Sequence, residues 1–139
     1  MIIQKDDDYF LIKIFKGDLK DFNFFDIDSI QDFFQDILDR LSKKYEVKGL
    51  LDVEVYVYES YGMIIEIRPI ESYFDEIDMR IRMHLDNVFL IEIDSNCILD
   101  YEDVYYYKNK FYSTYLDTCD NEVIYKDTDE IIDRGIKIY

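Results

Sequence analysis

The chain has 139 residues, of which 32 are Asp or Glu and 16 are Lys or Arg, and its formal net charge is -16. Such a charge repels the phosphates of nucleic acids and the anionic surface of a membrane, so it disfavours direct binding to either. A hydrophobic share of 49% and an aromatic share of 17% indicate a folded protein rather than a disordered one. We therefore expect a single domain over residues 1–139, with a basic protein as its partner.

The sequence carries no signal for export or for a membrane span. No apolar run approaches the roughly 18 residues that a span requires, and the opening MIIQKDDDYF lacks the basic start of a signal peptide. Cys97 and Cys119 are too few for a disulfide scaffold. These features predict a cytoplasmic protein. The lack of Ala and Trp and the abundance of Ile, Asp, Tyr and Lys suggest an AT-rich gene, as in low-GC bacteria or their phages.

The first predicted elements are a strand and a long amphipathic helix. Residues 9–16 (YFLIKIFK) alternate as a half-buried strand does. The segment SIQDFFQDILDRLSKKY, residues 29–45, has apolar residues at the helical period, and Ser29 or Asp28 can cap it. The predicted apolar stripe consists of Ile30, Phe33, Phe34, Ile37, Leu38, Leu41 and Tyr45.

After Gly49 the apolar residues recur at every second position, which is typical of strands. LLDVEVYVY (residues 50–58) alternates, with Asp52, Glu54, Tyr56 and Tyr58 pointing outward. The predicted inward residues are Leu51, Val53, Val55 and Val57. MIIEIRPI (residues 63–70) is the predicted return strand. EIDMRIRMHL (residues 76–85) and VFLIEID (residues 88–94) form a further predicted hairpin, because the Asp-Asn between them suits a turn.

The stretch YEDVYYYKNKFYSTY, residues 101–115, is the most aromatic part of the chain. Two runs rich in β-formers flank Lys108-Asn109, which predicts a hairpin whose tyrosines cover a half-buried sheet. A base-stacking platform would need a basic groove, but Asp and Glu flank these rings. A protein interface stays open as an alternative, because tyrosines are enriched there.

The tail, residues 127–139, predicts a helical turn ended by Gly135 and then a last strand. Taken together, the elements run β-α-β-β-β-β followed by a hairpin. We therefore predict an α+β fold in which one long amphipathic helix packs on a mainly antiparallel β-sheet.

Few residues indicate chemistry. His84, the single histidine, has no nucleophile at a supporting spacing, so an ordinary surface histidine, or one satisfied by structural contacts, is the favoured interpretation. The acidic segments 92–96 and 117–122 lack the spacing and the glycine of a calcium loop. We expect no enzyme, no cofactor and no metal site, with a carboxylate-based metalloenzyme kept as the least favoured alternative.

The order of elements over residues 9–67 resembles the N-terminal domain of MecA-type adaptor proteins: a strand, GDL, an acidic loop, a helix starting near DFF, KKYEVKG, and a return ending GMIIEI. The hairpin of residues 104–115 is similar to a tyrosine-rich hairpin in the second domain of that family. The resemblance implies a protein that recruits clients to a Clp-type unfoldase and is not an enzyme. Since the loop before the helix is shorter here, no residue role is carried over.

The hypothesis we favour is a non-enzymatic inhibitor that occupies the nucleic-acid-binding surface of a basic partner, as anti-restriction and anti-CRISPR proteins do. Its carboxylates would take the places of phosphates. The adaptor and the metalloenzyme are the alternatives. The predicted partner-binding residues are Asp32, Asp36, Asp39, Asp52, Glu54, Tyr56, Tyr105, Tyr107 and Tyr112.

Overall fold

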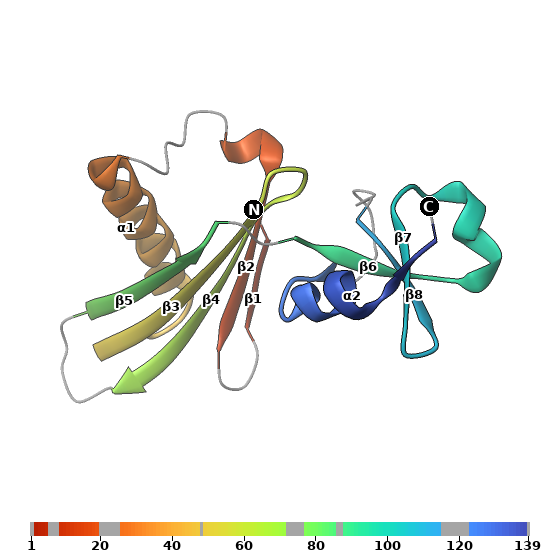
Figure 1. The fold of residues 1–139 in the computed structure, drawn as a ribbon. Helices are drawn as coiled ribbons and strands as arrows, with labels where there is room; N and C mark the ends of the chain where they lie inside the picture. The colour runs from red at the N-terminus through yellow and green to blue at the C-terminus, as the bar shows by residue number, and fades with distance from the viewer. Residues whose placement is uncertain are drawn as a thin grey trace. The chain divides into compact units, whose positions relative to one another are not determined.

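The computed structural model describes residues 2–5, 9–19, 26–47, 49–71, 77–85, 88–114 and 123–138. The chain divides into two compact units, Met1–Val55 with Gly62–Met83 and Tyr56–Tyr61 with His84–Tyr139. Each unit contains strands of its own five-stranded sheet (Figure 1). The single domain predicted over residues 1–139 stays a prediction, because two compact units can unfold together as one cooperative domain. In the part of the chain described, no helix is long and apolar enough to cross a membrane.

The first sheet has the strand order β1-β2-β4-β3-β5. Its strands are β1 (Ile2–Lys5), β2 (Phe10–Phe15), β3 (Gly49–Tyr58), β4 (Gly62–Glu71) and β5 (Ile77–His84). β2 pairs antiparallel with both β1 and β4. The predicted strands at residues 9–16, 50–58, 63–70 and 76–85 are therefore confirmed. β1 was missed, since an edge strand with mostly exposed side chains gives no alternating pattern.

A 3₁₀ turn, η1 (Lys16–Leu19), follows β2, and the long helix α1 spans Ile27–Lys44. The predicted stripe is confirmed at Phe34, Ile37, Leu38 and Leu41, which are buried. The predicted cap is wrong, because Asp26 rather than Ser29 or Asp28 accepts the hydrogen bond from a first-turn amide. The helix starts two residues earlier than the predicted segment, so the apolar stripe alone does not locate the cap. Beyond the helix, the Tyr45 ring packs on Phe10 of β2.

The centre of the first sheet is buried on both faces. Along β3 the buried residues alternate with half-buried ones, as predicted, up to Val55. In β4, however, Ile64 and Glu66 are buried as well as their neighbours Met63, Ile65 and Ile67. Glu66 lies 3.8 Å from the guanidinium of Arg68, which compensates part of the cost of burying a carboxylate.

The second sheet has the order β10-β7-β8-β6-β9. Its strands are β6 (Leu90–Ile93), β7 (Val104–Tyr107), β8 (Lys110–Ser113), β9 (Val123–Ile124) and β10 (Ile136–Lys137). A 3₁₀ helix, η2 (Ser95–Asp100), joins β6 to β7, and α2 (Thr128–Arg134) precedes β10. Lys108 and Asn109 have φ of 47° and 65°, as a two-residue hairpin turn requires. The predicted tyrosine-rich hairpin and the predicted tail helix and strand are confirmed.

Both faces of the second sheet carry an apolar cluster. On one face Leu90 and Tyr112 pack with Ile131 of α2. On the other, Ile91, Ile93 and Val104 pack with Ile98 of η2 and with Phe111. The register explains the division, since Glu92 pairs with Tyr112 and Ile93 with Phe111, and paired residues share a face.

The predicted fold class is wrong. Among the described residues strands outnumber helical residues, and they form two sheets rather than one sheet under a single long helix. The error begins at the predicted hairpin of residues 76–94: β5 belongs to the first sheet, while β6 pairs with β8 and β9 of the second. The Asp-Asn pair between them lies outside the described residues. A turn-like dipeptide is a local signal, whereas the choice of pairing partner depends on long-range contacts.

Candidate functional site

Three of the predicted partner-binding carboxylates, Asp32, Asp36 and Asp39, are exposed on α1. Spacings of four and three residues align them along one side of the helix, about 6 Å and about 4.5 Å apart along its axis. We call these three residues the α1 acidic row. Asp36 forms an ion pair of 3.3 Å with Arg40, and these side chains are 62% and 54% exposed. Asp39 accepts a hydrogen bond from Gln35. Because such exposed pairs contribute little, the row stays accessible to a partner.

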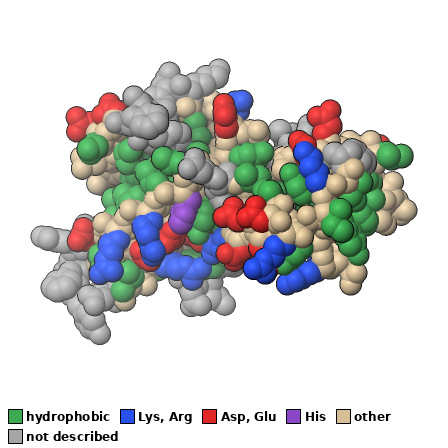
Figure 2. Space-filling model, viewed as in Figure 1, with side chains coloured by type: hydrophobic (Ala, Val, Ile, Leu, Met, Phe, Trp, Pro, Cys, Tyr) green, Lys and Arg blue, Asp and Glu red, His purple; other side chains and the backbone are tan. Residues whose placement is uncertain are grey.

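The other two predicted carboxylates, Asp52 and Glu54 on β3, are held by one cation. The guanidinium of Arg82 on β5 lies 3.7 Å from Asp52 and 2.8 Å from Glu54. These carboxylate side chains are 26% and 17% exposed, far less than Asp36. Basic side chains also lie among acidic ones on the face shown in Figure 2. Internal pairing therefore reduces the charge that Asp52 and Glu54 offer to a partner.

The tyrosines predicted to bind a partner from the hairpin lie against the core of the second unit. Tyr112 is buried, and Tyr105 and Tyr107 pack against its cluster. The Tyr107 hydroxyl donates a hydrogen bond of 2.7 Å to Glu130 of α2. That bond lowers the pKa of the Glu130 carboxyl, with smaller contributions from Lys108 and Arg134. These rings hold α2 against the sheet, and their role in partner binding stays a prediction.

Tyr56, the last predicted residue, belongs to an aromatic group of the second unit. Its ring stacks on His84 at 4.5 Å between centroids and meets Tyr125 edge-on at 5.0 Å. The buried ring of Phe89 contacts Tyr125 and also Tyr61, and burial raises the pKa of the Tyr61 phenol. His84 is exposed, which agrees with the predicted surface histidine.

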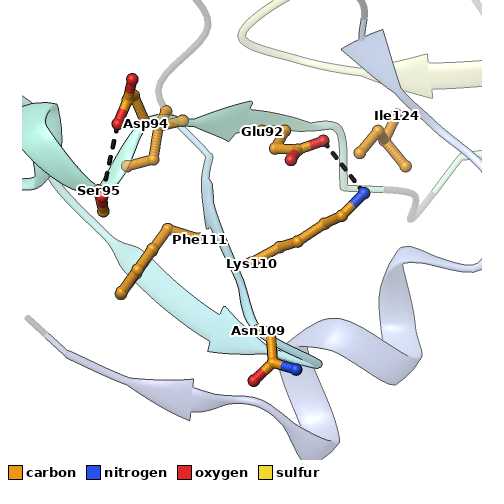
Figure 3. A pocket seen from close by; sticks show the side chains of 8 residues that line it. Glu92, Asp94, Ser95, Asn109, Lys110, Phe111 and Ile124 are labelled. Atoms are coloured by element: carbon orange, nitrogen blue, oxygen red, sulfur yellow. Dashed lines mark hydrogen bonds and ion pairs between the residues drawn. The ribbon is translucent and has the colours of Figure 1, made fainter.

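An open hollow of about 590 Å³ forms where β6 and β8 separate (Figure 3). Their ladder ends at the pair Ile93–Phe111. Beyond this pair β6 leads into η2, and β8 is preceded by the hairpin turn at Lys108-Asn109. The lining residues are Glu92, Ile93, Asp94, Ser95, Asn109, Lys110, Phe111 and Ile124.

Polar contacts place the side chains that line the hollow. Asp94 caps η2 and accepts a hydrogen bond of 3.1 Å from the amide of Asn96. Asn109 accepts one of 2.9 Å from the Tyr106 hydroxyl. Lys110 lies 3.6 Å from Glu92. From the sequence, residues 92–96 are only an acidic segment without the spacing of a calcium loop. The hollow could not be predicted, because the end of the ladder between two strands has no local signature.

Metal-dependent chemistry, the least favoured alternative, has no candidate centre among the described side chains. Within the described ranges, no group of three or more His, Cys, Asp or Glu side chains is placed to hold a metal ion. The acidic segment 117–122, including Cys119, lies outside the described residues. Cys97 is a half-buried free thiol in η2.

Comparisons with protein-family models, with curated proteins and with solved structures find no match. The resemblance to MecA-type adaptors therefore stays a prediction. Charge, exposure and pairing of the residues just described are the grounds for a functional proposal.

Proposed function

We propose that the protein is a non-enzymatic binding module that attaches to a basic partner protein through the α1 acidic row. The partner we propose is a nucleic-acid-handling enzyme, which the module inhibits by occupying its phosphate-binding groove. The observation that carries the proposal is the exposure of Asp32, Asp36 and Asp39 along one side of a helix, in a chain of net charge -16.

The charge density of the row supports phosphate mimicry. With a helical rise of about 1.5 Å per residue, Asp36 and Asp39 lie about 6 Å and about 10.5 Å along the axis from Asp32. One nucleic-acid strand carries one charge per ~3.4 Å of its axis, so three carboxylates over about 10.5 Å of helix give a density of negative charge of the same order. A groove lined with Arg and Lys side chains for phosphates can therefore pair with carboxylates of this row.

The helix also holds the row rigidly. Phe34, Ile37, Leu38 and Leu41 bury the opposite side of α1, so little backbone freedom is lost when the row binds. Carboxylates fixed on a packed element give charge-assisted, bidentate pairs with arginine at a low entropic cost. In contrast, Asp52 and Glu54 would first have to give up Arg82. We therefore assign the main contact to the helix and not to β3.

Affinity capture tests the proposal. The wild-type protein and a row variant carrying Asp32→Asn, Asp36→Asn and Asp39→Asn serve as baits in a lysate of the organism that carries the gene. Quantitative mass spectrometry then compares the captured proteins. We expect the wild type to enrich a nucleic-acid-handling enzyme, and the row variant to lose most of that enrichment.

The matched control removes three charges elsewhere. Asp100→Asn, Glu102→Gln and Asp133→Asn change exposed residues of the second unit, so the net charge changes equally. This control should capture the partner as the wild type does. Equal losses in both variants would show a general charge effect without a defined contact, and unchanged capture by the row variant would overturn the assignment to α1.

A further inference from the structure

We propose that the hollow between β6 and β8 is a binding site for an arginine side chain of a partner protein (Figure 3). This inference rests on the proposed function, because it supplies a second contact for the same basic partner. It concerns the second unit, whereas the α1 acidic row belongs to the first.

The charge of the hollow favours a cation. Glu92 and Asp94 contribute two carboxylates to its lining, and Lys110 contributes one ammonium group. Lys110 and Glu92 are 56% and 52% exposed and 3.6 Å apart, and a pair that exposed is weak. An incoming guanidinium can replace the ammonium at Glu92, because the flexible lysine stem can move into water.

The shape and lining favour arginine over other cations. Ile93, Phe111 and Ile124 form the apolar wall of the hollow. A planar guanidinium stacks on an aromatic face while its five N–H donors reach carboxylates at its edges. A lysine ammonium is a compact point charge that is more strongly hydrated, so it gains less from such a wall.

The surroundings favour a protein side chain over a free small molecule. Pockets for small molecules are mainly apolar and bury about 70–90% of their ligand, whereas this hollow is open and its rim is mostly polar. The Phe111 ring packs on the Tyr106 ring, with 5.1 Å between the ring centroids. Tyr106 in turn pairs across the sheet with Ile136, which is exposed. A chain segment can place an arginine in the hollow and an apolar residue on these neighbours.

An NMR titration of the full chain tests the site directly. The probe is acetylated and amidated hexaarginine, followed through the backbone amide signals of residues 92–95 and 109–111. We expect a saturable shift of these signals, with its own dissociation constant. The matched uncharged probe, hexacitrulline, should shift them little.

Two pairs of variants distinguish binding at the hollow from a general effect of net charge. Glu92→Gln should weaken binding at these amides about two- to fivefold, the range of an exposed ion pair, whereas the exposed Asp133→Asn should change it less than about twofold. Lys110→Gln should strengthen binding by a similar factor, because it removes the competing ammonium. Lys108→Gln removes the same charge two residues away, where the side chain lies over the Tyr107 ring, and should have little effect.

The outcomes distinguish this site from the proposed function. If hexaarginine shifts only amides of α1, the hollow is not a site, while the proposed function stands. If hexacitrulline shifts the amides of the hollow as much as hexaarginine does, the inference is wrong. It is also wrong if Lys108→Gln and Lys110→Gln change hexaarginine binding at these amides equally. Shifts of the hollow amides that persist in the row variant and weaken with Glu92→Gln would support it even if the α1 contact fails. No shift in either place would overturn both.

Discussion

Replacing Tyr112 by alanine should destabilise the protein strongly, because this ring joins β8 to the α2 side of the second sheet. Tyr112 is buried against Leu90 and Ile131, with Tyr105 and Tyr107 beside it. A buried aromatic side chain removes about 150–250 Å² from water, which corresponds to about 4–6 kcal/mol at ~25 cal/mol per Å². Because the unfolded chain already buries part of this area, the estimate falls by up to about 40%, and we expect a loss of stability of at least about 2.5–3.5 kcal/mol.

Urea unfolding followed by circular dichroism measures this loss, with Tyr112→Phe as the control. The phenylalanine variant keeps the ring and should cost less than about 1.5 kcal/mol, the typical value of one hydrogen bond. Because native domains are stable by only about 5–15 kcal/mol, the alanine variant should show a clearly lower urea midpoint. A Tyr112→Ala midpoint equal to that of the wild type would refute the buried cluster and show a loosely ordered hairpin.

Three further predictions follow from single contacts. Gly62→Ala should destabilise the protein by more than about 1 kcal/mol, because Gly62 has φ of 128° and an added Cβ would lie 2.2 Å from a carbonyl oxygen of β2, whereas Gly17→Ala meets open space and should be tolerated in the same thermal melts. Asp26→Ala should cost about 1 kcal/mol in urea unfolding, since it removes the α1 cap. Because the Glu130 pKa is lowered in the folded state, its stabilising contribution is present above the unfolded pKa and is lost as pH falls through the folded pKa. In Tyr107→Phe the melting temperature should therefore fall less steeply with decreasing pH than in the wild type. Melts over a range of acidic pH that show the same slope for both proteins would contradict the role of this hydrogen bond.

Local features of the fold could be predicted because their causes lie close together in sequence. The α1 stripe repeats at the helical period, and the alternation from Leu51 to Val55 marks a half-buried strand. The hairpin turn at Lys108-Asn109 follows from two strand-forming runs joined by two residues with positive φ. In each case a few neighbouring residues determine the structure.

Features that depend on distant partners could not be predicted. β6 carries buried apolar residues on both faces, because α2 covers one face and η2 packs against the other. The predicted hairpin over residues 76–94 did not take this burial on both faces into account. The pairing of Arg82 with Asp52 and Glu54 requires β3 and β5 to be neighbours. The hollow at Glu92 and Lys110 likewise depends on where two strands separate. Charge read from the sequence alone therefore does not distinguish paired carboxylates from accessible ones.

The most direct test of the central claim is the salt dependence of partner affinity. Dissociation constants of the captured partner are measured from about 50 mM to about 500 mM salt, over which the Debye length falls about threefold. The α1 acidic row predicts that wild-type affinity falls steeply with salt and that the row variant binds more weakly with a shallower slope. A wild-type affinity that is flat across this range, or a row variant with an unchanged affinity and slope, would contradict recognition of a basic surface by Asp32, Asp36 and Asp39.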